Sequence, residues 1–290
     1  MTQIDASRAE ASLQKMTWQG APKVVNLRKA FILGPWFVAE YRLRNMSKWI
    51  AAIIAFGIGN PLLYLLSVGL GVGALVDANT GPSGVDGVSY LTFLAPALLA
   101  SATIQGAMDE TSFPTLQGFV WDKSFFGMNS TQLSGRAIVW GVMIAAGVRC
   151  LLTAFLYEGI LLAFGSITWA SIPSLTLASF FAGMAFAAVM LAGISFVKQD
   201  DGVFAIVGRF IIAPMFMFSG TFFPLTALPI YLQWIGWISP VWHATNLGRA
   251  LSYGMPLEPW LAVVHVVYLL VMLVAGMWVG SWQFARRLAQ

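Results

Sequence analysis

The chain has 290 residues, a formal net charge of +4 and a mean hydropathy of +0.76, with 58% hydrophobic and only 10% charged residues. Soluble domains carry about 25% charged residues, so this composition excludes an ordinary soluble enzyme, a nucleic-acid-binding domain and a disordered chain. It indicates an integral membrane protein. The single cysteine, Cys150, excludes an internal disulfide bond.

Residues 1–46 are expected to form a cytoplasmic N-terminal part. Residues 1–22 are polar and lack the apolar core of a signal peptide. From about Val24 to Arg44, aromatic and aliphatic residues lie between basic ones, which is typical of an amphipathic helix in the membrane interface. A basic linker that only sets topology is the alternative. Gly34-Pro35 is expected to break or kink this helix, or to start a second helical piece.

Six apolar stretches follow, each close to the ~20 residues that a helix needs to cross a bilayer. A span must satisfy its own backbone hydrogen bonds, so residues 47–290 are predicted to be an all-α integral membrane domain with six transmembrane helices. The first outer loop is then expected at 71–88. The spans are expected at about 47–70, 89–108, 137–163, 173–197, 202–220 and 260–282.

The basic residues predict the orientation of these spans. Thirteen of the sixteen Lys and Arg lie before the first span, between spans two and three, between spans four and five, or in the C-terminal tail. Because cytoplasmic loops carry the excess of Lys and Arg, both termini are expected in the cytoplasm. An even number of spans agrees with this arrangement.

The cytoplasmic segment 109–135 combines few charges with several aromatic residues. An exposed loop does not keep such residues without a partner surface or a membrane over them. We therefore predict that the segment docks a cytoplasmic protein, and a loop folded back on the bilayer is the alternative. The residues expected to take part are Phe113, Phe119, Trp121, Asp122, Lys123, Phe125 and Phe126.

Residues 221–259 form an apolar segment that is broken by prolines. Its short pieces cannot each cross the bilayer, so they are predicted to form a re-entrant helical hairpin on the outer side. A passive outer cap is the alternative. Its tryptophans suit an interfacial aromatic belt. The residues expected to form the outer gate and hairpin are Phe222, Phe223, Pro224, Pro229, Pro240, Trp242 and His243.

Three charged residues, Arg149, Glu158 and Arg209, fall within predicted spans. Arg149 and Glu158 are nine residues apart and would lie on nearly opposite helix faces, so they are not expected to pair with each other. Each is expected either to have a structural partner or to act in transport. The small-residue spacings Gly276-x-x-x-Gly280 and Ala51-x-x-x-Ala55-x-x-x-Gly59 would allow close helix packing.

The sequence contains no phosphate-binding loop, no metal-ligand spacing and no nucleophile elbow, so no catalytic or metal-binding residue is assigned. One catalytic alternative rests on Asp109-Glu110 and Asp200-Asp201 at the cytoplasmic border, which could bind Mg²⁺ as in a membrane prenyl transferase. Adjacent side chains on a helix point about 100° apart, however, which does not favour a shared metal site. Solvated loop acids are the simpler interpretation.

With these elements in place, the chain resembles the membrane subunit of type-2 ABC exporters, the ABC-2-type permeases. The local likeness is to a Phe-Ser-Gly-x-x-Phe-Pro turn, a Leu-Pro step and a hydrophobic-x-Pro-hydrophobic-x-His stretch. Within the family the chain is most similar to drug and lipo-oligosaccharide exporters, including daunorubicin-resistance and nodulation-factor permeases. The matching residues are Phe218 to Leu225, Leu228-Pro229 and Ile238 to Ala244.

The resemblance implies a permease that is not an enzyme by itself and binds no cofactor of its own. ATP and Mg²⁺ would be bound by two separate ABC ATPase subunits, and a second copy of the chain or a sister permease would complete the complex. The segment Phe113 to Met128 would contain the coupling helix that meets the ATPase. The implied setting is a bacterial cytoplasmic membrane, with no nucleic-acid partner.

The implied function is ATP-driven outward export of an amphipathic lipid-linked, lipo-oligosaccharide or drug-like molecule. A polysaccharide exporter of similar architecture remains an alternative.

Overall fold

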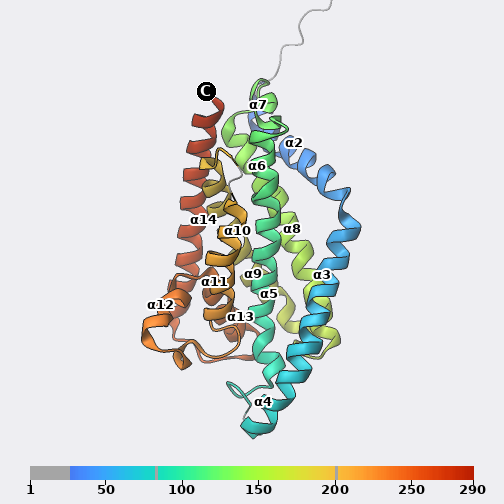
Figure 1. Cartoon of the computed structure of the whole chain (residues 1–290), viewed down its shortest axis with the longest axis vertical. Helices are drawn as coiled ribbons and strands as arrows, with labels where there is room; N and C mark the ends of the chain where they lie inside the picture. The colour runs from blue at the N-terminus through green and yellow to red at the C-terminus, as the bar shows by residue number, and fades with distance from the viewer. Residues whose placement is uncertain (1–26, 82–83, 200–201) are drawn as a thin grey trace, which may run out of the picture.

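Helices that run along one long axis dominate the computed structural model, which describes residues 27–81, 84–199 and 202–290 (Figure 1). The first half contains α2 (Leu27–Ser47), α3 (Ile50–Tyr64), the π-helix η1 (Leu65–Val72), α4 (Gly73–Thr80), α5 (Tyr90–Thr111), α6 (Phe113–Val120), α7 (Ser124–Asn129) and α8 (Gly135–Ala163). The second half contains η3 (Trp169–Ser171), α9 (Ile172–Phe196), α10 (Val203–Val207), the π-helix η4 (Gly208–Ile212), α11 (Ala213–Phe218), η5 (Leu225–Ala227), α12 (Ile230–Ile238), α13 (Pro240–Tyr253) and α14 (Pro259–Leu288). The predicted all-α class is confirmed.

Five helical stretches are long and apolar enough to cross a membrane, and they coincide with five of the six predicted spans. The stretch predicted at 202–220 is a shorter apolar helix, Val203–Phe218, which contains the π-helical turn η4. The count of six therefore stays a prediction. The five long stretches are Ile50–Thr80, Tyr90–Val120, Gly135–Ala163, Trp169–Phe196 and Pro259–Leu288.

The first span is longer than the sequence predicted. Helical structure continues through η1 and α4, where a loop was expected from residue 71. The π turn η1 includes Gly69 and Gly71, and α4 begins at Gly73 directly after it, so the chain stays helical. The helix ends at Gly81, which adopts a φ of 65° and donates its N–H to the Asp77 carbonyl.

The predicted interfacial helix exists as α2, but the break expected at Gly34-Pro35 is absent. Helical structure continues through Pro35 because α8 supports this part of α2 by close contact. A Cβ on Gly34 would lie 3.3 Å from the Ala137 Cβ, and one on Gly141 would lie 2.6 Å from the Pro35 carbonyl oxygen. The packing therefore compensates for the hydrogen bond that proline cannot donate.

The core of the bundle lies around α9, which contacts α5, α8, α13 and α14. A Cβ on Gly276 would lie 2.6 Å from the Ala188 carbonyl carbon, so α14 approaches the α9 backbone closely. The predicted packing role is therefore confirmed for Gly276. A Cβ on Gly59, in contrast, would meet no described atom within 4 Å, so the spacing that ends at Gly59 makes no such contact within the chain.

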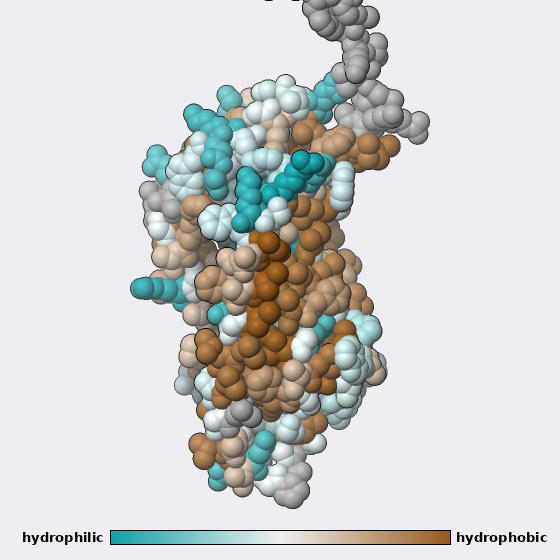
Figure 2. All heavy atoms as spheres, turned by 90° about the vertical axis from the view of Figure 1, so that its right-hand side faces the viewer, coloured by the Kyte–Doolittle hydropathy of each residue, from teal (hydrophilic) through white to brown (hydrophobic). Residues whose placement is uncertain are grey.

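An apolar surface covers the middle of the molecule on the side of α2, α3 and α8. Figure 2 shows a broad hydrophobic surface on the side of α2, α3 and α8, with hydrophilic residues gathered at the end that carries α6 and α7. Little of either helix is buried inside the protein: the buried share is 11% for an 18-residue apolar segment of Ile50–Thr80 and 17% for one of α14. Such faces suit contact with lipid or with another membrane helix.

Candidate functional site: coupling end, membrane groove and outer hairpin

The predicted coupling segment, residues 109–135, contains two short helices, α6 and α7, at the end of the molecule where α14 also ends (Figure 1). Phe113 and Trp121 are each 48% exposed, and their ring centroids are 5.1 Å apart. Asp122 and Lys123 are also exposed, and Lys123 adopts a left-handed φ of 52° that turns the chain between the helices. These four residues, which we call the coupling tip, present an aromatic pair beside two opposite charges.

The other predicted docking residues lie inside the protein. Phe119 and Phe125 are buried and pack edge to face at 5.0 Å, and Phe119 also contacts Phe284 of α14 at 4.7 Å. Phe126 is partly buried beside them. These rings hold α6 and α7 against α14, so they shape the coupling tip without belonging to its surface.

Arg287 strengthens the same joint. Its guanidinium donates to the carbonyls of Ser195 at 3.0 Å and Val197 at 2.7 Å, and it lies 4.0 Å above the Phe119 ring. The carbonyls at the end of α9 lack partners within their own helix, so an arginine is well suited to cap them. One side chain thus joins α14, α9 and α6.

A buried ion pair connects α2 to the start of the coupling segment. Arg42 Nε donates to Glu110 Oε1 at 2.8 Å, and another of its nitrogens donates to the Pro114 carbonyl at 3.1 Å. The side chains of Arg42 and Glu110 are 6% and 11% exposed. Because Pro114 lies in the first turn of α6, the pair fixes the position of α6 relative to α2.

The acidic pair Asp109-Glu110 therefore already has basic partners. Arg149 of α8 lies 3.4 Å from Asp109, and Arg42 binds Glu110. Each carboxylate thus has an ion-pair partner within the protein, which does not favour the transferase alternative. The second acidic pair of that alternative, Asp200-Asp201, lies outside the described residues.

The structure separates the three intramembrane charges. Arg149 pairs with Asp109, whereas Glu158 is buried and accepts hydrogen bonds from the Thr176 hydroxyl at 2.8 and 2.9 Å. Arg149 and Glu158 do not pair with each other, as their spacing predicted. Arg209 lies in η4 and is exposed. The first two therefore have structural partners, and a transport role remains a prediction for all three.

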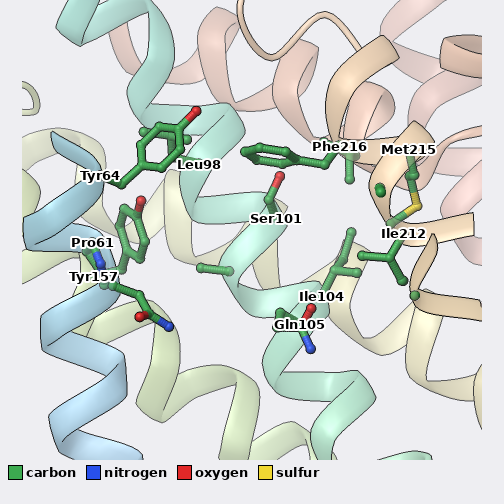
Figure 3. A pocket seen from close by; sticks show the side chains of 15 residues that line it. Pro61, Tyr64, Leu98, Ser101, Ile104, Gln105, Tyr157, Ile212, Met215 and Phe216 are labelled. Carbon is green, nitrogen blue, oxygen red and sulfur yellow. The ribbon is translucent and has the colours of Figure 1, made fainter. Parts of the chain in front are cut away.

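A groove of about 340 Å³ lies between α3, α5 and α8 on one side and η4 and α11 on the other. Figure 3 shows Tyr64 and Tyr157 on one side of it and Ile212, Met215 and Phe216 on the other, with Ser101 and Gln105 of α5 between them. The lining is mostly apolar, with a few hydroxyl and amide groups. We call this cavity the membrane groove.

Aromatic residues gather between the membrane groove and the hairpin. Tyr64 lies 6.1 Å from Phe216 and 6.3 Å from Phe222, and the last two rings meet edge to face at 5.2 Å. The Tyr90 hydroxyl donates to the Phe222 carbonyl at 3.1 Å. Phe222, predicted as an outer gate residue, is thus held over the groove.

The predicted hairpin consists of η5, α12 and α13, and its prolines stand at helix starts. Pro224 and Pro229 immediately precede η5 and α12, and Pro240 is the first residue of α13. Ser239 caps α13 by accepting the Val241 N–H at 3.2 Å. Phe223 is half-buried, and Gly220 makes the preceding turn with a φ of 72°. Entry into the outer leaflet stays a prediction.

His243 anchors the hairpin to α14. Its Nε2 binds the Trp237 carbonyl at 3.0 Å, and its Nδ1 lies 2.7 Å from Nδ1 of His265. Burial lowers the pKa of His243 to about 4, so the ring is neutral at pH 7. A carbonyl only accepts, so His243 carries its hydrogen on Nε2 and accepts from His265 through Nδ1. Trp242 packs edge to face on both rings.

Arg249 of α13 joins the hairpin to the bundle. It is 3% exposed, and it donates to the carbonyls of Phe93 at 3.2 Å and Gly220 at 2.9 Å. Its guanidinium also lies 3.6 Å above the Phe93 ring. Burial lowers its pKa to about 10, which still leaves it charged at neutral pH. The arginine thereby holds the turn at Gly220 against α5.

Comparison with known proteins decides the family. The model of the ABC-2 type transporter family matches residues 42–253, which include the coupling end, the groove and the hairpin. The chain belongs to this family. An ABC-2 permease is the membrane subunit of an ABC exporter, and its ATPase is a separate chain.

Named relatives of this ABC-2 permease agree with the assignment. Nodulation protein J of Rhizobium leguminosarum bv. viciae is 28% identical over 248 residues, which cover 84% of this chain and 92% of the relative. Nodulation protein J of Bradyrhizobium diazoefficiens is 26% identical, covering 84% and 91%. The probable multidrug ABC transporter permease YbhR of Escherichia coli K12 is 27% identical, covering 57% and 44%.

Three residues of the permease escaped sequence reasoning. They are Arg249, Arg42 and His265, none of which a sequence pattern singles out. The available signal for Arg249 and His265 was that each places a polar group in an apolar segment, where it needs a partner. No sequence feature identified those partners.

Proposed function

We propose that this permease moves an amphipathic lipid-linked, lipo-oligosaccharide or drug-like molecule outward across a bacterial cytoplasmic membrane. The observation that carries the proposal is the membrane groove, which joins an apolar lining to Ser101, Gln105 and two tyrosines within a chain of the ABC-2 family. Such a lining suits a molecule with both apolar and polar parts. The relatives named for nodulation and for multidrug permeases support this class of cargo.

Energy enters the proposed complex at the coupling tip. Two ABC ATPase subunits, which hold ATP and Mg²⁺, bind the coupling tips of two permease chains, and a homodimer is the simplest assembly. Closure of the ATPase pair moves α6, and the Arg42–Glu110 pair carries that motion to α2 and α5. Both termini then face the cytoplasm, and the aromatic residues around Phe222 close the outward path until the helices tilt.

The docking part of the proposal is tested by Trp121→Ala in the purified complex. We expect about tenfold weaker binding of the ATPase subunit. Truncation of a tryptophan at the centre of an interface typically weakens the binding free energy by more than about 1.4 kcal/mol, which corresponds to tenfold in affinity. The measurement is co-purification followed by surface binding kinetics. Trp169→Ala is the matched control, because Trp169 is 79% exposed and lies in η3, outside the coupling segment. Equal binding by both variants would refute the docking surface.

The groove is tested by Ser101→Phe, which places a ring in a cavity of about 340 Å³. We expect normal assembly and basal ATP hydrolysis, with loss of most ATP-driven uptake of a fluorescent lipid analogue into inside-out vesicles. Leu177→Phe places the same ring on an exposed face of α9 and is expected to transport normally. Unchanged uptake by the Ser101 variant would exclude the groove from the path.

A further inference from the structure

A second polar cavity lies at the outer end of the molecule, beneath the hairpin. It has a volume of about 630 Å³, within the range of small-molecule sites, and we call it the outer pocket. Its walls come from the turn at Gly220, from α12 and α13, and from residues 255–261 that lead into α14. The outer pocket and the coupling tip therefore lie at opposite ends of the bundle (Figure 1).

The lining of the outer pocket combines indole rings with planar polar groups. Trp237 and Trp242 provide the indoles, Gln233 and Asn246 provide amides, and Asp86 provides a carboxylate. The Gln233 amide nitrogen donates to the Leu228 carbonyl at 2.8 Å, so its carbonyl oxygen remains as an acceptor.

Arg249 adds donors to this wall. Among the described residues, it commits one N–H each from Nε and Nη2 to the carbonyls of Phe93 and Gly220. A guanidinium has five such donors, so others remain at the pocket wall. Because the side chain is held on both sides by backbone and by the Phe93 ring, those donors have a fixed orientation. The pocket wall thus includes a buried guanidinium that is held in place before any ligand binds.

We propose that the outer pocket binds the saccharide part of the exported molecule. A pyranose ring has an apolar C–H face that can lie on an indole, and hydroxyls that both donate and accept hydrogen bonds. The pocket offers partners for both: two indoles, acceptors on Gln233, Asn246 and Asp86, and donors on Asn246 and Arg249. The inference rests on the proposed export function, because it assigns a resting place to the polar head of that cargo.

Other ligand chemistries fit the outer pocket less well. An acyl chain would leave the charged and amide groups without partners, at a large desolvation cost. An isolated anion would meet a single arginine that Asp86 partly neutralises, and a cationic drug would meet the buried positive charge of Arg249. A neutral glycan avoids all three conflicts.

A neighbouring face of α12 provides a contrast. There, Trp234, Ile235 and Ile238 line a separate apolar cavity of about 510 Å³ with Tyr268 and Met272 of α14. Trp234 and Trp237 lie one helical turn apart and are both exposed, yet they line different cavities. This pair provides a matched test within one nine-residue helix.

The experiment uses the full-length chain in lipid nanodiscs, without ATP, titrated with cellotetraose and maltotetraose. Saturation-transfer NMR and tryptophan fluorescence measure binding. We expect saturable binding of at least one tetrasaccharide, weakened about tenfold by Trp237→Ala and several-fold by Asn246→Ala, and unchanged in Trp234→Ala. No saturable binding, equal loss in both tryptophan variants, or binding of sodium phosphate alone would overturn the proposal.

The same variants separate this inference from the proposed function. Tetrasaccharide binding that depends on Trp237, in a complex that performs no ATP-driven export, would support the pocket and refute the exporter. ATP-driven export of a glycolipid that Trp237→Ala does not slow, together with absent tetrasaccharide binding, would refute the pocket and leave the exporter standing.

Discussion

Arg42→Met is expected to lower the stability of the end that carries α6 and α7 by about 3–5 kcal/mol and to remove most ATP-driven export. That magnitude is typical when one partner of a buried ion pair is deleted and the other charge stays without compensation. Arg42 also holds the Pro114 carbonyl, so α6 loses its connection to α2 as well. Thermal unfolding of the purified chain and uptake into inside-out vesicles measure the two effects.

A neighbouring ion pair provides the control. Arg44 pairs with Glu40 at 2.6 Å on the same helix, but their side chains are 79% and 41% exposed. Exposed pairs contribute about 0–1 kcal/mol, so Arg44→Met should unfold and transport much like the parent protein. The double variant Arg42→Met, Glu110→Gln should recover part of the lost stability, because no buried charge remains unpaired. If the Arg42 and Arg44 variants proved equally stable, the Arg42–Glu110 ion pair would not contribute to the stability of the protein.

Gly276→Ala is expected to separate α14 from α9. The added methyl would lie 2.6 Å from the carbonyl carbon of Ala188 and 2.7 Å from the amide nitrogen of Val189, which are backbone atoms that cannot rotate away. Overpacking of this kind costs about 1–3 kcal/mol or more. We expect a lower melting temperature in detergent and a broader size-exclusion peak.

Gly280→Ala, one helical turn further along α14, is the matched control. Its methyl would lie 3.7 Å from the Ala192 Cα, which is ordinary contact, and alanine is the better helix former by about 1 kcal/mol. The Gly280 variant should therefore be neutral or slightly more stable. A Gly276 variant that unfolded at the same temperature as the Gly280 variant would contradict the close approach of the two helices.

The sequence predicted the helices well because each long span is an apolar run near the length of a bilayer crossing. It failed where local signals and tertiary contacts disagreed. A loop was expected from residue 71 and a break at Gly34-Pro35, yet the chain stays helical through η1 and α4 in the first region and against α8 in the second. In neither region do the neighbouring residues indicate that the helix continues.

The candidate sites were predictable in kind and much less so in detail. The aromatic segment 109–135 was identified correctly as unusual, but composition does not tell that Trp121 is exposed while Phe125 is fully buried. The membrane groove draws its lining from five separate stretches of the chain. Arg42 and Glu110 are 68 positions apart, and a single sequence holds no information on such a contact.

Three arginines, Arg42, Arg249 and Arg287, hold the bundle together through main-chain carbonyls. Every residue type carries a carbonyl, so most substitutions at Pro114 or Val197 leave the acceptor in place. A saturation mutational scan should therefore be asymmetric, with the arginine positions intolerant and Pro114 and Val197 tolerant. Pairwise covariation between positions would not detect these carbonyl contacts, because the acceptor does not depend on side-chain identity.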